Sequence, residues 1–247
     1  MSRFAPFSFA REGAIIHLTK EPLIRSREVG KAAKQCVRPG GSCLPCPDRG
    51  IGYFCMQKRG EHMAIQLEMK AEIMDGQAMQ RALRRVAHEI IENNRGVEGL
   101  TLVGIQRRGV SLARMLQALI EEVEGVRLPM GVLDITFYRD DLSLLQEHPI
   151  VNATDLPFQV QDARIIMVDD VLYTGRTARA AMDAICDMGR PALIQLAVMV
   201  DRGHRELPIR ADYVGKNLPT AKSEMVGVQV PDIDGTLGVV LYDKKCV

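Results

Sequence analysis

The chain has 247 residues, of which 47% are hydrophobic and 26% are charged, and its formal net charge is +1. This composition is that of an ordinary globular protein, and so small a net charge means that any polyanion site must come from local clustering of basic side chains. No apolar run approaches the roughly 18 residues that span a bilayer, and the N-terminus lacks the pattern of a signal peptide, so we expect a cytoplasmic protein.

Residues 1–62 show little apolar periodicity, and Pro, Gly, Arg and Cys crowd the stretch from position 38 to 59. A zinc site would need Cys36, Cys43, Cys46 and Cys55, but only the central pair has the two-residue gap typical of zinc ligands, so zinc is not expected. Arg-Gly-Glu ahead of Met63 can be encoded by a purine-rich run like a bacterial ribosome-binding site. We therefore predict that residues 1–62 are a translated leader, a non-native or disordered extension, and that residues 63–247 form the functional domain.

Helical and strand-like patterns alternate after Met63. Asp75 is a good N-cap, and apolar residues then recur at helical spacing as far as Asn93. The later elements are predicted as strands at 100–105, 131–138, 164–168 and 193–200, helices at 111–122 and 176–188, and a long polar connection at 139–162. Such alternation predicts an α/β fold built from parallel βαβ units.

The most specific stretch runs from Ile165 to Thr177 and reads IIMVDDVLYTGRT. An apolar strand leads into two adjacent carboxylates, and a turn at residues 173–177, here called the phosphate turn, then opens a helix. Backbone N–H groups, two hydroxyls and the helix N-terminus can hold a phosphate there. Asp169 and Asp170 would repel a phosphate, but they suit ribose hydroxyls, which donate hydrogen bonds to carboxylates.

This stretch resembles the 5-phosphoribosyl-1-pyrophosphate (PRPP) motif of type I phosphoribosyltransferases. The resemblance implies a mainly parallel sheet flanked by helices, with a small C-terminal hood. It also implies that Asp169 and Asp170 hold the ribose 2′ and 3′ hydroxyls and reach Mg²⁺ only indirectly, through PRPP. The residues implied to bind PRPP are Val171, Leu172, Tyr173, Thr174, Gly175, Arg176 and Thr177, together with Arg107, Arg108 and Gly109 of a second loop.

That second loop, residues 104–109, ends a predicted strand and looks like the family's pyrophosphate loop. Backbone amides and Arg108 can stabilise negative charge on the departing pyrophosphate. Arg107 stands where the family has Thr, which is a departure from the pattern. Asp134, Arg139, Asp140 and Asp141 lie at the end of the next predicted strand and the start of the polar connection, which we interpret as a flap that excludes water. Arg139 joins Asp169, Asp170 and Arg108 as a candidate catalytic residue.

Three further stretches resemble one branch of this superfamily. They are FYRDDLS at 137–143, VDRGHRELPIR at 200–210 and GKNLPT at 215–220. They are similar to the PyrR family, whose members regulate pyrimidine operons and carry uracil phosphoribosyltransferase activity. The resemblance implies conversion of uracil and PRPP to UMP and pyrophosphate. It also implies binding of pyrimidine-operon mRNA when UMP or UTP is bound, with early termination of transcription.

Basic residues support an RNA partner independently of the resemblance. Arg81, Arg84, Arg85 and His88 share one face of the first predicted helix, opposite its apolar face. By the resemblance, the RNA-contacting candidates are Arg84, Arg85, His88, Arg205, Arg210 and Lys216, with Arg84 standing where well-known members have Thr. Two rival interpretations remain: a plain nucleobase phosphoribosyltransferase without RNA regulation, and a regulator that has lost the chemistry. The family resemblance also suggests a homodimer or higher oligomer.

Overall fold

The structure is a computed structural model that describes residues 51–58, 61–136, 138 and 154–246. All of these belong to one compact unit of the chain, Leu44–Val247. Cys36, Cys43 and Cys46 lie outside the described residues, as does the Cys55 side chain. The predicted leader therefore lies mostly outside the described part of the chain.

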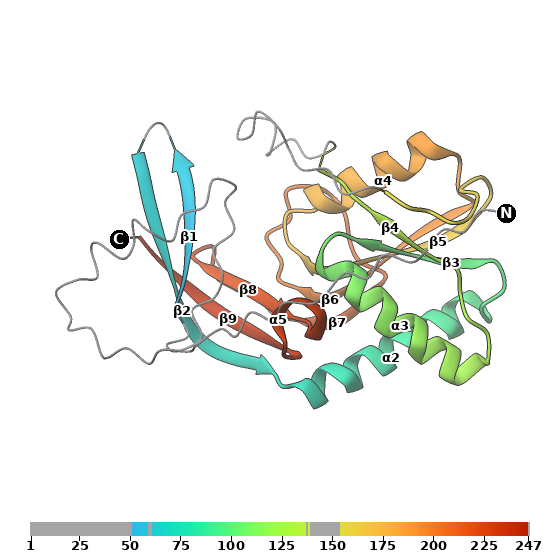
Figure 1. Cartoon of the computed structure of the whole chain (residues 1–247), viewed down its shortest axis with the longest axis horizontal. Coiled ribbons are helices and arrows are strands. Elements are labelled where there is room, and N and C mark those ends of the chain that lie inside the picture. Colours follow the sequence, from blue (N-terminus) through green and yellow to red (C-terminus); the bar gives the residue numbers. More distant parts are fainter. Residues whose placement is uncertain (1–50, 59–60, 137, 139–153, 247) are drawn as a thin grey trace, which may run out of the picture. The chain divides into compact units, whose positions relative to one another are not determined.

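The larger sheet of the described residues has five parallel strands in the order β4-β3-β5-β6-β7 (Figure 1). Their bounds are β3 Leu100–Ile105, β4 Met130–Leu133, β5 Arg164–Leu172, β6 Leu193–Asp201 and β7 Tyr213–Asn217. β5 lies at the centre, which agrees with its nearly unbroken run of buried residues. The prediction of an α/β fold with a mainly parallel sheet is confirmed.

Helices cover both faces of this sheet. Helices α2 (Gly76–Asn94) and α3 (Arg108–Glu124) lie on one face, and α4 (Arg176–Met188) lies on the other (Figure 1). Side chains alternate along β5, so Ile166 and Val168 pack into the core under α2 and α3, while Ile165 and Met167 pack into the core under α4. The result is two apolar layers, with the central strand sandwiched between them.

The predicted first helix is confirmed down to its cap, because Asp75 Oδ1 accepts a hydrogen bond of 2.7 Å from the Ala78 N–H. Two strands differ from the prediction. β5 does not end before the acids but continues through Asp169 and Asp170 to Leu172, paired with β6. β4 stops at Leu133, where Asp134 turns inward and accepts the Thr136 N–H at 2.9 Å.

A second sheet is antiparallel, with strand order β1-β2-β9-β8. Its strands are β1 Ile51–Lys58, β2 Glu61–Met74, β8 Glu224–Gln229 and β9 Gly238–Cys246, and the short helix α5 (Pro231–Asp234) joins the last two. The segment from β8 to β9 forms the predicted hood. Met63 lies inside β2, and this strand pairing does not test whether the native chain begins there.

None of the helices in the described part of the chain is both long enough and apolar enough to cross a membrane.

Candidate functional site

The two adjacent acids of β5 lie at its carboxyl end with their positions set by the strand. Asp169 is buried, with 9% of its surface exposed, and Asp170 is partly buried. Asp169 Oδ1 accepts the Asp170 N–H at 2.9 Å, and Asp170 Oδ1 accepts the Val171 N–H at 2.8 Å. These bonds to the backbone orient both carboxylates at the edge of the sheet where ligands bind in α/β folds.

The phosphate turn follows directly and encloses a cavity of about 260 Å³. The lining is Val171, Leu172, Tyr173, Thr174, Gly175, Arg176, Thr177 and Glu206. Gly175 has φ 92°, a left-handed conformation that favours glycine, and it caps the N-terminus of α4. Backbone N–H groups and the positive end of the helix therefore converge on a space that can hold a phosphate group. All seven residues predicted to bind PRPP in this stretch, 171–177, line the cavity.

Residues 202–212, here called the connecting segment, lead from β6 to β7 and form hydrogen bonds with the phosphate turn. The carbonyl oxygen of Thr174 accepts the N–H groups of Glu206 at 3.0 Å and Leu207 at 3.1 Å. Arg205 donates to the carbonyl oxygens of Tyr173 at 2.6 Å and Leu172 at 3.2 Å, and it forms an ion pair with Asp201. The turn and the connecting segment are thus one hydrogen-bonded unit.

The Tyr173 side chain is fixed by two neighbours from the connecting segment. The Arg202 guanidinium lies 4.2 Å from the centre of the ring, and His204 contacts it edge-on at 5.9 Å. Burial lowers the pKa of Arg202, whose guanidinium donates to Thr220 Oγ1 and to the Glu224 carbonyl oxygen. The cation therefore acts as an internal support that links β6 to the hood.

The pyrophosphate loop lies against the same end of β5, because Gly109 allows a very close approach to that strand and Gly104 allows one within the loop itself. A Cβ at Gly109 would lie 2.3 Å from the Val168 carbonyl oxygen, and one at Gly104 would lie 2.6 Å from Val110 Cα. The peptide bond between Gln106 and Arg107 is cis. This contact places the predicted pyrophosphate loop directly beside Asp169.

Replacing Gly109 with Ala tests this close approach. The added methyl group meets a backbone carbonyl that cannot move aside, so we expect a loss of about 1–3 kcal/mol in the free energy of unfolding. Separation of the pyrophosphate loop from β5 should also raise the KM for PRPP. Thermal denaturation and steady-state kinetics measure the two effects. A variant with unchanged stability and KM would contradict the packing described.

Arg108 reaches across to the hood. Its Nη2 lies 2.8 Å from Asp234 Oδ1 and its Nε lies 3.3 Å from Oδ2, which is the two-pronged geometry of a strong pair. Val230 N–H holds the same carboxylate at 3.0 Å, and neighbouring Asp232 accepts from Ser111 at 2.8 Å. The start of α3 and the hood helix are therefore joined by charged hydrogen bonds.

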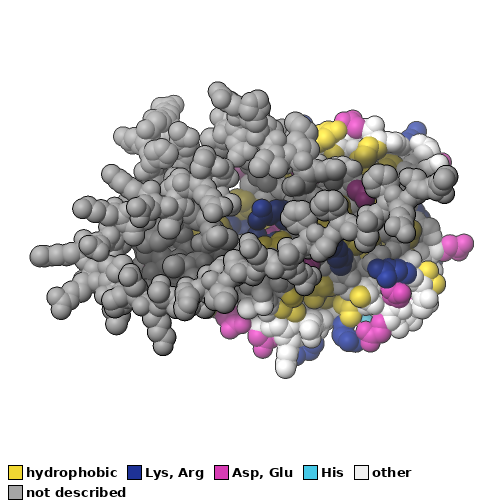
Figure 2. All heavy atoms as spheres, viewed as in Figure 1, with side chains coloured by type: hydrophobic (Ala, Val, Ile, Leu, Met, Phe, Trp, Pro, Cys, Tyr) yellow, Lys and Arg dark blue, Asp and Glu magenta, His cyan; other side chains and the backbone are white. Residues whose placement is uncertain are grey.

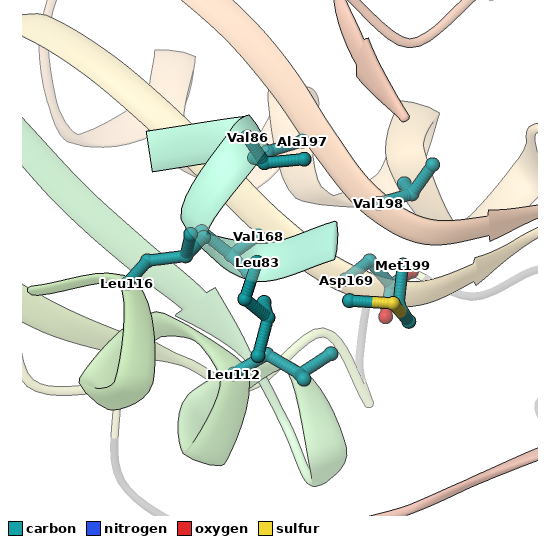
Figure 3. Close-up of a pocket in the computed structure, with 9 residues that line it drawn as sticks. All are labelled: Leu83, Val86, Leu112, Leu116, Val168, Asp169, Ala197, Val198 and Met199. Atoms are coloured by element: carbon teal, nitrogen blue, oxygen red, sulfur yellow. The ribbon is translucent and has the colours of Figure 1, made fainter. Parts of the chain in front are cut away.

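A small apolar void lies behind the acids, between α2, α3, β5 and β6 (Figure 3). Figure 3 shows Leu83, Leu112 and Leu116 pointing into it, with Met199 beside Asp169. Its volume is about 10 Å³. That is no more than one water probe occupies, so the void is a packing gap and not a substrate site.

The predicted RNA-binding residues fall into two groups. Arg84, Arg85 and His88 are exposed on α2, and Arg85 donates to the carbonyl oxygens of Val214 at 2.9 Å and Gly215 at 2.7 Å on β7. Lys216 is exposed on that same strand, so the basic face of α2 and Lys216 both adjoin β7. Figure 2 shows Lys and Arg next to Asp and Glu where described residues are visible on the face in view.

The second group lies in the connecting segment beside the phosphate turn. Arg210 is exposed, as expected for a surface contact. Arg205 is 22% exposed and directs its guanidinium at carbonyl oxygens and at Asp201, so its main contacts are internal. Its predicted role in contacting RNA stays a prediction, whereas its contacts with the phosphate turn are observed.

Some predicted residues lie elsewhere. Arg139, Asp140 and Asp141 lie outside the described residues, so their roles in a flap or in catalysis stay predictions. Asp134 is buried and bonded to Thr136 at the start of that connection. Arg107 is exposed at the N-cap of α3 and has no capping bond from its side chain.

Comparison with known proteins decides the family. Residues 69–233 match the phosphoribosyl transferase domain family. The chain is 62% identical over 175 residues to the bifunctional protein PyrR of Caldicellulosiruptor bescii, covering 71% of this chain and 96% of that protein. It is 59% identical over 176 residues to the bifunctional protein PyrR of Deinococcus radiodurans, covering 71% and 96%. The chain belongs to the PyrR family.

Solved structures agree on the fold. The hypoxanthine phosphoribosyltransferase of Trypanosoma cruzi superposes with a TM-score of 0.56 at 18% identity, over 72% of this chain and 98% of that one. The corresponding figures for a hypoxanthine-guanine phosphoribosyltransferase of Bacillus anthracis are 0.53 and 16%, over 71% and 99%. The prediction of a type I phosphoribosyltransferase fold within the PyrR family is confirmed.

Sequence reasoning missed the roles of three residues in the site. Glu206 lines the cavity, Asp234 pairs with Arg108, and Arg202 supports Tyr173. Glu206 could have been singled out from the sequence, because it is an acid in the otherwise basic stretch at 202–210. Asp234 gave none, because it lies 126 residues from its partner.

Proposed function

We propose that this chain transfers the phosphoribosyl group of PRPP to uracil and uses the same site to sense uridine nucleotides that control its binding to pyrimidine-operon mRNA. The function predicted from the sequence, an attenuator of these operons with uracil phosphoribosyltransferase activity, is that of the family to which the chain belongs. The observation that carries the proposal for the site is the pair of oriented acids leading into the phosphate turn and its cavity.

In this proposal each part of the site meets one part of PRPP. The phosphate turn holds the 5′-phosphate, and Asp169 and Asp170 accept hydrogen bonds from the ribose hydroxyls. Arg108 and the amides of the pyrophosphate loop stabilise charge on the leaving group. Uracil is itself the nucleophile, so the protein contributes position and electrostatics and no covalent intermediate.

The carboxylates fit an indirect role toward Mg²⁺. Each commits one oxygen to a backbone N–H, and among the described residues no group of three or more Asp, Glu, His or Cys side chains is arranged to hold a metal ion. Mg²⁺ commonly reaches such sites through substrate phosphates with only one or two carboxylates nearby. It would supply charge neutralisation at the pyrophosphate.

The proposed transfer is tested by the uracil-dependent release of pyrophosphate from PRPP. The full chain should form UMP from uracil and reject hypoxanthine and adenine. Transfer to a purine with no transfer to uracil would overturn the assignment of the base.

The RNA surface is tested by replacing Lys216 with Ala. Loss of one exposed cation should weaken RNA binding several-fold and lower the slope of log affinity against log salt by about one, with unchanged uracil transfer. Lys222→Ala is the matched control, because Lys222 is also exposed but is not among the candidates. Equal effects of both variants would point to a general charge effect and against a defined surface.

We also propose that residues 1–62 are translated leader and not part of the working domain, which makes β1 (Ile51–Lys58) an added edge strand on β2. The PyrR relatives match 71% of this chain with 96% of their own length, which supports this division. Mass spectrometry of the protein from its source cell would test it, and an abundant peptide from before Met63 would contradict it. A cytoplasmic location and assembly into a dimer or higher oligomer remain part of the proposal.

A further inference from the structure

The cavity in the phosphate turn has an acid in its lining. Glu206 comes from the connecting segment, and its Oε2 lies 2.8 Å from Arg176 Nε at the start of α4. A carboxylate at this place is unexpected, because every other feature of the turn favours negative charge on the ligand. A phosphate bound there would bring close to two negative charges up to Glu206 and would compete for Arg176.

The backbone around Glu206 is tied to the same turn. The N–H groups of Glu206 and Leu207 both donate to the Thr174 carbonyl oxygen, at 3.0 and 3.1 Å. Arg205, the preceding residue, donates to the carbonyl oxygens of Tyr173 and Ile209. Glu206 therefore belongs to a short segment that is hydrogen-bonded to the phosphate turn, and the same segment carries the exposed Arg210.

We propose that the negative charge of Glu206 opposes phosphate binding in the phosphate turn and links that binding to the position of the connecting segment. The 5′-phosphate of UMP or PRPP replaces Glu206 as the partner of Arg176 and repels the Glu206 carboxylate. The connecting segment, which carries Arg205 and Arg210, then changes its position. This inference rests on the proposed function, because it assumes that the turn holds the 5′-phosphate. It adds a residue to that site and gives a physical route from nucleotide binding to the RNA surface.

The exposure of the pair favours such an exchange. The side chains of Arg176 and Glu206 are 49% and 53% exposed, so solvent screens their attraction and the pair holds weakly. A phosphate monoester carries more charge than a carboxylate and presents more acceptor oxygens to the guanidinium. Arg176 therefore gains by exchanging partners, whereas a deeply buried pair would resist the exchange.

The test compares Glu206→Gln with wild type by calorimetric titration of UMP and of uridine, which lacks the phosphate. Removing the charge while keeping the shape should tighten UMP binding about three- to tenfold, and the gain should shrink at high salt. Uridine affinity should not change. Asp183→Asn is the matched control, because Asp183 is half-exposed and pairs with Arg179 on the same helix, at 3.4 Å; its UMP affinity should equal that of wild type.

The second readout is RNA affinity with and without UMP. If Glu206 links the two sites, the gain in RNA affinity that UMP gives should be at least halved in Glu206→Gln, because the phosphate no longer repels a charge on the connecting segment; by reciprocity, the gain in UMP affinity that RNA gives should fall by the same factor. If Glu206→Gln binds UMP no more tightly than wild type, Glu206 does not oppose phosphate binding. If UMP raises the RNA affinity of Glu206→Gln as much as that of wild type, Glu206 does not link the two sites. Failure of the wild-type chain to bind UMP would instead reject the proposed function itself, so the two failures can be told apart.

Discussion

The double variant Asp169→Asn, Asp170→Asn is expected to lose nearly all uracil transfer while keeping its fold. Two charge-assisted hydrogen bonds to the ribose are worth about 1.5–3 kcal/mol each, which corresponds to a fall of roughly 150- to 25,000-fold in kcat/KM. The fold should survive, because in each case an amide oxygen can accept the backbone N–H that the carboxylate oxygen accepts now.

Steady-state kinetics and thermal denaturation measure these two effects. Asp162→Asn is the matched control, since Asp162 is an exposed acid at φ 59°, a backbone conformation that Asn also adopts readily. The control should keep full activity. A double variant that still transfers the ribosyl group at the wild-type rate would overturn the assignment of the two acids.

Arg205→Ala is expected to have the largest effect on stability of the predicted RNA-binding residues. It removes donors to the Leu172, Tyr173 and Ile209 carbonyl oxygens and leaves Asp201 without its cation. We expect a loss of about 2–3 kcal/mol in the free energy of unfolding. The phosphate turn loses its support at the same time, so uracil transfer and RNA binding should both fall.

Arg210→Ala is the comparison that separates support from contact. Arg210 lies in the same segment but is exposed, so its loss should leave the melting temperature nearly unchanged and reduce RNA affinity alone. For Arg205→Ala the melting temperature should fall by about 5–10 °C. An Arg205→Ala protein with wild-type stability and activity but weak RNA binding would show that Arg205 contacts RNA directly.

Local signals in the sequence were sufficient for the parallel sheet and the phosphate turn. The Asp75 cap, the apolar face of α2 and the apolar run of β5 each act over a few residues, so their patterns can be read from neighbouring positions. The phosphate turn was predictable for the same reason, since its acids, Gly175 and helix start follow one another along the chain.

Long-range contacts could not be predicted in this way. The pairing of β2 with β9 joins residues near position 70 to residues near 240, and two register shifts interrupt its alternation. The Arg108–Asp234 pair and the inward turn of Arg205 depend on packing that brings distant segments together. An arginine in a basic stretch looks the same in sequence whether it faces solvent or a row of carbonyl oxygens.

We propose that one site both binds PRPP and controls RNA binding through uridine nucleotides. The most direct test titrates the full chain into labelled leader RNA of its own pyrimidine operon, with and without UMP, at fixed near-physiological salt. We predict tight binding that UMP strengthens. Weak binding that is indifferent to UMP would contradict the claim and leave a plain uracil phosphoribosyltransferase whose basic residues on α2 are an ordinary solvated face.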